Sequence, residues 1–176
     1  MDVVDALHRR VELRDYTNEP VEADIVRAIL DAARVAPSGH NSQHWRFILV
    51  DDADTLETLA EVSTTGTWIA DAAFAVVVLT DPAYAYHHLD AGRAITHMQL
   101  AGWADGVGSC IYTGYDENAM RSLLDIPDAY AISAVVGFGY PPFDPDRLRG
   151  RKNRRALHAV AFDGRFGTPL DRFNDT

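Results

Sequence analysis

Positive charge is concentrated at two places in a chain that is acidic overall. The 176 residues carry a formal net charge of −10, yet six of the 16 Lys and Arg fall within one nine-residue window. That window holds Arg147, Arg149, Arg151, Lys152, Arg154 and Arg155, and a second group near the N-terminus holds Arg9, Arg10 and Arg14. Because such side chains bind phosphates and carboxylates through charge-assisted hydrogen bonds, the two groups indicate a local anion site.

A second chemically informative segment reads Ala36-Pro-Ser-Gly-His-Asn-Ser-Gln-His-Trp45. Its composition predicts a loop between a helix end and a strand. Small hydroxyl and amide side chains in such a loop can present several hydrogen-bond donors and acceptors to the edge of a planar polar ligand. Two other interpretations stay open. The loop could be a self-bonded turn, and the N-terminal arginines could be a solvated helix end that favours the negative pole of the helix dipole.

The motifs of several other chemistries are missing from the sequence. It contains no GxxxxGK(S/T) phosphate loop and no GxSxG serine nucleophile, and prolines follow the glycines at 137–142, where a dinucleotide fingerprint needs a helix. Cys110 lies in an apolar strand context, which predicts a core residue rather than a nucleophile. The seven histidines form no HExxH-type arrangement, so we expect no catalytic metal.

The composition, 47% hydrophobic and 24% charged, is that of a folded globular protein. The length predicts one domain over residues 1–176. No apolar run approaches the roughly 18 residues of a bilayer span. The single cysteine and the missing secretory pattern lead us to expect a cytoplasmic protein. Overall acidity argues against a nucleic-acid binder.

Hydrophobic periodicity and capping residues predict how the segments are positioned. We expect helices at about 2–10, 22–35, 54–62, 85–105 and 116–124, and strands at about 45–50, 74–80, 109–112 and 130–138, with 158–162 as a possible edge strand. Asp2 and Asp116 are the expected N-caps. The run FAVVVLT at 74–80 is apolar on both faces, which indicates a central strand. The irregular alternation of helices and strands limits the fold to the α+β or α/β class.

Taken in order, these segments resemble the nitroreductase family of FMN-dependent oxidoreductases. The family's R-x-S-x-R-x-(F/Y) opening is similar to the segment with Arg10, Arg14 and Tyr16, and its A-P-S-x-x-N-x-Q-P-W segment is similar to residues 36–45. Further matches, in chain order, are Asp90-Ala-Gly-Arg-Ala94, Gly106-Val-Gly108, Thr113-Gly-Tyr-Asp116, Gly137-Phe-Gly-Tyr-Pro141 and Lys152-Asn-Arg154. The similarity covers about residues 3–160.

The resemblance implies an α+β fold of three layers, in which helices flank a central, mainly antiparallel sheet. It also implies a homodimer with FMN in the groove between the subunits. The helix at 85–105 is rich in Ala and Gly, which allows another backbone to approach closely, either in the core or across a subunit interface.

The resemblance also assigns cofactor-binding residues. Arg10, Lys152 and Arg154 would bind the FMN phosphate. Arg14 would lie at the pyrimidine edge of the flavin, where a positive charge stabilises the reduced, anionic ring. The other implied contacts are Ser38, Asn41 and Gln43 in the loop, Thr65, and the backbone of Thr113 and Gly114.

The implied activity is transfer of a hydride from NADH or NADPH to flavin N5, followed by reduction of a small electron-poor acceptor such as a nitroaromatic or a quinone, in ping-pong order. No side chain is expected to be catalytic, because the flavin carries the chemistry. Two alternatives within the fold are fragmentation of reduced flavin by oxygen and reductive dehalogenation. A further alternative is a non-catalytic flavin- or anion-binding protein. From another class, the alternative is a non-catalytic binder that uses the run at 147–155 as a patch for nucleic acid or an acidic partner.

Four positions depart from the family's pattern. Glu12 replaces the usual Ser, so a carboxylate comes close to the expected phosphate site and should turn outward or pair with an arginine. His44 replaces the usual Pro, which predicts a less rigid loop. Thr65 and Trp68 occupy the region where many relatives carry Asn and Lys for the flavin.

Overall fold

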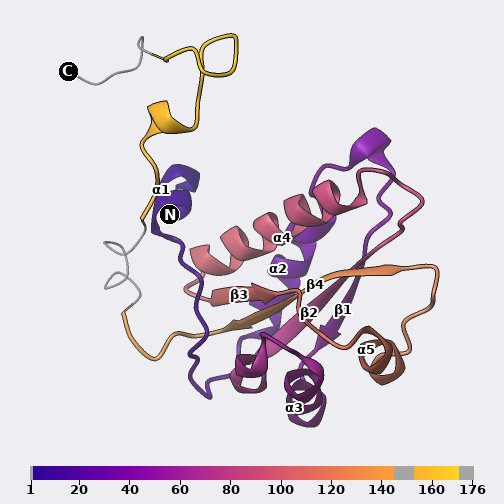
Figure 1. The fold of residues 1–176 in the computed structure, drawn as a ribbon. Helices are drawn as coiled ribbons and strands as arrows, with labels where there is room; N and C mark the ends of the chain where they lie inside the picture. The colour runs from indigo at the N-terminus through magenta and orange to yellow at the C-terminus, as the bar shows by residue number, and fades with distance from the viewer. Residues whose placement is uncertain (1, 145–152, 171–176) are drawn as a thin grey trace. The chain divides into compact units, whose positions relative to one another are not determined.

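The computed structural model describes residues 2–144 and 153–170. The chain divides into two compact units, Met1–Pro145 and Asp146–Thr176, and the first contains the sheet and the α-helices (Figure 1). That both units fold as one domain stays a prediction. Among the described residues, none of the helices combines the length and apolar character needed to cross a bilayer.

The first unit is built on a four-stranded sheet whose spatial order is β1-β2-β4-β3 (Figure 1). The strands are β1 Arg46–Val50, β2 Phe74–Thr80, β3 Gly108–Tyr112 and β4 Ala131–Gly139. All neighbouring strands are antiparallel, which confirms the expected α+β class. Every residue of β2 is buried, as its apolar run predicts for a central strand.

Five α-helices are found in the described residues: α1 Val3–Arg9, α2 Ala23–Arg34, α3 Ala53–Val62, α4 His87–Ala104 and α5 Glu117–Leu123. Each lies within three residues of its predicted bounds. The carboxylates of Asp2, Asp52 and Asp116 accept hydrogen bonds from backbone N–H groups in the first turns of α1, α3 and α5. Helix α2 ends at Arg34, shortly before Pro37.

Helices α2 and α4 cover one face of the sheet and form the main core with it. The rings of Phe74 and Phe138 stack there with centroids 4.8 Å apart. Ala91, Ala94 and Met98 of α4 are buried in this core, so small side chains let the helix approach the sheet closely. On the other face, the 3-10 helix η2 (Thr67–Asp71) and α3 pack against β3 and β4.

The described part of the second unit, 153–170, contains a short 3-10 helix at Leu157–Ala159. The edge strand predicted at 158–162 is therefore wrong. The backbone closes turns there instead, with the N–H groups of Ala159 and Val160 bonded to the carbonyls of Ala156 and Leu157. Leu157 and Val160 remain more than half exposed, so no sheet partner holds this segment extended.

Phe138 provides a direct test of the core. Replacing it by Ala removes a fully buried ring and leaves a cavity, so we expect the free energy of unfolding to fall by about 3–5 kcal/mol in urea denaturation. Phe166→Ala is the matched control, because that ring is 93% exposed and its loss should change stability by less than about 0.5 kcal/mol. Equal, small losses in both variants would contradict the packing described here.

Candidate functional site

The N-terminal segment after α1 lies along strand β3. Glu12 forms an isolated parallel bridge with Ser109, and the Leu13 N–H donates to the Ser109 carbonyl at 2.9 Å. The Leu13 side chain fills the space that a Cβ on Gly108 would need, and the Tyr16 hydroxyl donates back to the Leu13 carbonyl at 2.6 Å. The segment that carries the two predicted arginines is thus fixed at the outer edge of the sheet.

Charged side chains interact closely on this segment. Arg10 forms an ion pair with Glu12 through its Nη1 atom, which confirms that Glu12 pairs with an arginine. Gln99 of α4 donates from Nε2 to both carboxylate oxygens of Glu12 at 3.3 Å. Arg14 is exposed. The segment therefore presents two cations, and Arg10 is already paired with a carboxylate.

Cys110 lies beneath this segment and is 2% exposed, as expected for a core residue. Burial raises the pKa of its thiol, and the nearby Glu12 carboxylate raises it further, while the Arg14 guanidinium opposes the rise. The thiol is therefore held protonated near neutral pH, which does not suit a nucleophile.

The predicted residues Thr65, Thr113 and Gly114 lie together just beyond the end of β3. The Thr64 N–H donates to the Gly114 carbonyl at 2.8 Å, and Ser63 bridges Tyr115. A Cβ on Gly114 would lie only 2.8 Å from the Thr65 hydroxyl oxygen. Position 114 must therefore be a glycine, because a side chain there would clash with Thr65.

Trp68, the other departure in this region, packs between two tyrosines. Its ring lies 6.3 Å from that of Tyr16 and 5.9 Å from that of Tyr112. Within the described residues, its Nε1 atom is buried without a hydrogen-bond partner. Trp68 thus occupies the position as a packing residue and supplies neither the amide nor the charge that relatives carry there.

The loop with Ser38, Asn41 and Gln43 has an unusual backbone. His40, Asn41 and Gln43 have φ angles of 51°, 54° and 48°, in the left-handed region that non-glycine residues rarely adopt. The Ser38 hydroxyl accepts from the Gln43 N–H at 3.0 Å, so the self-bonded turn is present. Clustered strain of this kind costs free energy and occurs preferentially at ligand-binding sites.

A buried carboxylate anchors this loop to the start of α4. Asp90 is fully buried and accepts hydrogen bonds from the Gly39 N–H at 2.9 Å and from Arg93 at 3.0 Å. His44 Nε2 lies 3.2 Å from the same carboxylate, and its ring stacks on Tyr84. The expectation that His44 loosens the loop is wrong, since its imidazole ties the loop to the helix. Sequence reasoning missed this network, although an acidic residue on the apolar stripe of a helix signals a buried partner.

Within one chain, the predicted residues form two groups. Arg10 and Arg14 lie along β3, with Thr65, Thr113 and Gly114 beyond its end. The loop group is bonded to Asp90 of α4, whereas Glu12 is bonded to Gln99 of the same helix. At a rise of 1.5 Å per residue, Asp90 and Gln99 lie about 13 Å apart along the helix axis. Figure 1 shows α4 running between these two regions.

Two predicted phosphate ligands come from the second unit. Arg154 is exposed there, and its Nη1 donates to the Asn153 carbonyl at 3.1 Å. Lys152 lies outside the described residues. The convergence of Arg10, Lys152 and Arg154 on one anion therefore stays a prediction.

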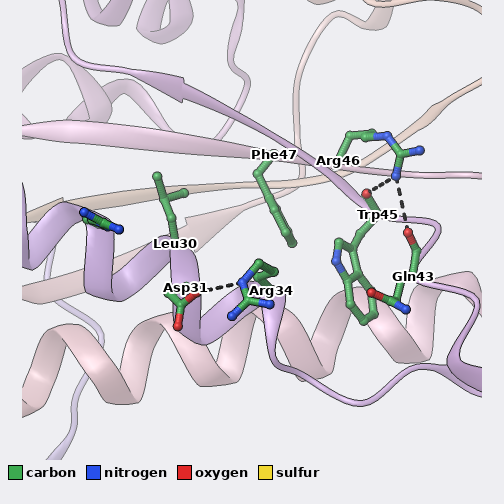
Figure 2. A pocket seen from close by; sticks show the side chains of 8 residues that line it. Leu30, Asp31, Arg34, Gln43, Trp45, Arg46 and Phe47 are labelled. Atoms are coloured by element: carbon green, nitrogen blue, oxygen red, sulfur yellow. Dashed lines mark hydrogen bonds and ion pairs between the residues drawn. The ribbon is translucent and has the colours of Figure 1, made fainter.

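A cavity of about 500 Å³ lies between α2 and β1 (Figure 2). Its lining consists of Arg27, Leu30, Asp31, Arg34, Gln43, Trp45, Arg46 and Phe47. Arg34 pairs with Asp31 at 2.7 Å, and Arg46 donates to the carbonyls of Gln43 and Trp45. Of the predicted residues that the structure describes, Gln43 alone lines this cavity, so the cavity does not gather the predicted site.

The donor set fits an anionic, planar cofactor better than a metal. Exposed and half-exposed guanidinium groups lie along β3, Gly114 lies just beyond its end, and the strained polar loop is bonded to Asp90 at the start of α4. In the part of the chain that the structure describes, no three His, Cys, Asp or Glu side chains are placed to hold a metal ion. The arrangement is suited to binding phosphate and the hydrogen-bonding edge of an aromatic ring.

Comparison with known proteins identifies the class of this fold. The family model described as "Nitroreductase family" matches residues 7–81 and 65–140. The "Putative NADH dehydrogenase/NAD(P)H nitroreductase" of Archaeoglobus fulgidus is 31% identical over 166 residues, which cover 83% of this chain and 95% of the relative. A protein of the same description from Methanothermobacter thermautotrophicus is 30% identical over 86% of this chain and 88% of its own length.

Solved structures agree with this assignment. An FMN-dependent nitroreductase from Clostridium difficile is 28% identical and superposes with a TM-score of 0.75, covering 87% of this chain and 98% of that chain. The chain therefore belongs to the nitroreductase family. It is an α+β oxidoreductase, and the family expected from the sequence is confirmed.

The buried Asp90 network can be tested by substitution. Asp90→Ala leaves the Gly39 N–H and the His44 and Arg93 side chains without their shared acceptor, so we expect a loss of about 3 kcal/mol or more in unfolding free energy. Asp31→Ala removes an exposed ion pair and should cost under about 1 kcal/mol. Urea denaturation measures both, and an Asp90 variant as stable as the Asp31 variant would show that the loop is not anchored this way.

Proposed function

We propose that this chain is an FMN-dependent NAD(P)H oxidoreductase that reduces small electron-poor acceptors such as nitroaromatics and quinones. The observation that carries the proposal is the fixed backbone of the segment that holds Arg10 and Arg14 along β3. Its relatives are described as NAD(P)H nitroreductases and as an FMN-dependent nitroreductase, which supports both the cofactor and the electron donor.

Each predicted residue has a role in binding this cofactor. Arg10, with Lys152 and Arg154, holds the phosphate, and each charge-assisted hydrogen bond to it contributes roughly 1.5–3 kcal/mol. Arg14 lies near the pyrimidine edge of the ring. The remaining contacts come from Ser38, Asn41 and Gln43 in the loop and from Thr65, Thr113 and Gly114 beyond β3. A bound FMN would supply the redox chemistry, which is hydride and electron transfer between NAD(P)H and the acceptor.

The protein's own residues position and pack rather than transfer protons. Burial raises the pKa of the Tyr16 phenol and of the Tyr112 phenol well above their usual range, so both remain neutral. Tyr16 fixes the arginine segment through its bond to Leu13 and packs closely on Gly139. The single cysteine, buried and protonated, suits the reducing cytoplasm in which we expect this enzyme to act.

We further propose a homodimer with FMN between the subunits. The two groups of predicted residues are bonded to different parts of α4, at Asp90 and at Gln99, and in the proposed dimer the loop group of one chain lies next to the arginine group of the other. Val3 and Val4 on α1 are 64% and 60% exposed, which supplies apolar surface for such a contact. Sedimentation should show a dimer with two FMN, and a flavin-loaded monomer would contradict the arrangement.

Redox cycling of the flavin tests the activity. Under anaerobic conditions, NADH or NADPH should bleach the visible flavin absorbance of the purified holoprotein, and a nitroarene or quinone should restore it. Failure of both nucleotides to bleach the flavin would overturn the hydride-transfer proposal. Irreversible, oxygen-dependent loss of the spectrum would identify the flavin-fragmenting alternative instead.

The assigned role of Arg14 predicts a shift in flavin potential. Arg14→Ala removes a positive charge that stabilises negative charge on the reduced ring, so the midpoint potential should fall. Arg14→Lys keeps the charge and should retain most of the wild-type potential. Spectroelectrochemical titration of the three proteins measures the change. An unchanged potential in the alanine variant would remove Arg14 from the flavin edge.

A further inference from the structure

Glu12 places a negative charge directly beside Arg10, the residue proposed to bind the FMN phosphate. The two side chains form an ion pair, with 26% of Arg10 and 42% of Glu12 exposed. The family's pattern has a neutral Ser at this position. An incoming phosphate therefore meets a guanidinium that already has an anionic partner.

The carboxylate is held in place from a second direction. Gln99, which is 5% exposed on α4, donates from Nε2 to both oxygens of Glu12. The backbone of Glu12 is fixed by its bridge to Ser109. Because the backbone and the carboxylate are both anchored, Glu12 cannot swing far from Arg10 when another anion approaches.

Glu12 also lies near Cys110 and Tyr16. Its effect on the pKa of Cys110 and of Tyr16 is to raise both, as a negative charge close to them must. Arg14 is the other cation near these two groups, and it acts on them in the opposite direction. The proposed role of Arg14 is at the flavin ring, so its charge is not assigned to the phosphate end.

We propose that Glu12 is a specificity-determining residue that competes with the phosphate ester for Arg10. Riboflavin lacks the phosphate. With Glu12 present, the protein therefore prefers FMN to riboflavin by a smaller factor than a protein with a neutral residue at position 12. The inference rests on the proposed function, since it assumes that Arg10 receives the phosphate.

Electrostatics sets the expected size of the effect. A phosphate monoester carries about −1.5 to −2 charges at neutral pH. At roughly 6 Å from a carboxylate in a water-like dielectric, the repulsion corresponds to about a tenfold change in affinity. Riboflavin carries no such charge and should be almost unaffected. Added salt should reduce the effect, because the groups are partly exposed.

The test is the ratio of the dissociation constants of riboflavin and FMN, measured by flavin fluorescence quenching on flavin-stripped full-length protein. Glu12→Gln keeps the shape and Glu12→Ser restores the family's residue, and both should raise the ratio by about tenfold. Glu12→Asp keeps the charge and should stay closer to wild type than either. Glu57→Gln, on the exposed side of α3, removes an equal charge elsewhere and should leave the ratio unchanged.

A structural role for Glu12 would change both affinities together and leave their ratio constant, so a constant ratio in the Gln and Ser variants overturns the inference. A lower ratio overturns it too, because Glu12 would then be helping Arg10 to bind phosphate. These outcomes require that the wild-type protein binds FMN. If neither wild type nor either variant binds FMN, the proposed function itself fails, and the two failures are distinguishable.

Discussion

The candidate site depends on the pairing of a short N-terminal segment with the outer strand of the sheet. Three contacts fix the segment. Its backbone bonds to Ser109, the Leu13 side chain packs against Gly108, and the Tyr16 hydroxyl donates to the Leu13 carbonyl. Long, flexible arginine side chains lose rotamer entropy when they bind an anion. A backbone that is already held in place reduces the remaining entropic cost of binding.

A second constraint acts at the start of α4. The loop that follows α2 contains three left-handed non-glycine residues, and conformations of this kind persist only when the surroundings enforce them. Asp90 provides that enforcement through Gly39 and His44, while Tyr86 lies so close to Gly39 that no side chain would fit there. A fully buried carboxylate is costly, and here three donors satisfy it. Helix α4 thus supports the loop at Asp90 and the arginine segment at Gln99.

The sequence predicted most of the secondary structure because its signals are local. Capping aspartates and helical periodicity gave the helix bounds within three residues, and the apolar run at 74–80 gave the central strand. The order of the strands, the Asp90–His44 contact and the Gln99–Glu12 contact could not be predicted, because each joins residues far apart in the chain. The strand predicted at 158–162 failed for the opposite reason. Residue type favoured an extended backbone there, but none of the described strands pairs with this segment, which contains a 3-10 turn. Sequence motifs identified the residues of the candidate site, but only the structure shows that these residues form two groups.

The proposed cofactor site requires that the arginine segment along β3 and the backbone beyond it bind one FMN molecule. A crystal structure of the protein with FMN tests this most directly. We expect the phosphate within hydrogen-bonding distance of Arg10 and the flavin ring against Thr113 and Gly114, with Arg14 at its edge. Density for FMN in the cavity between α2 and β1, with Arg10 still paired only to Glu12, would contradict it.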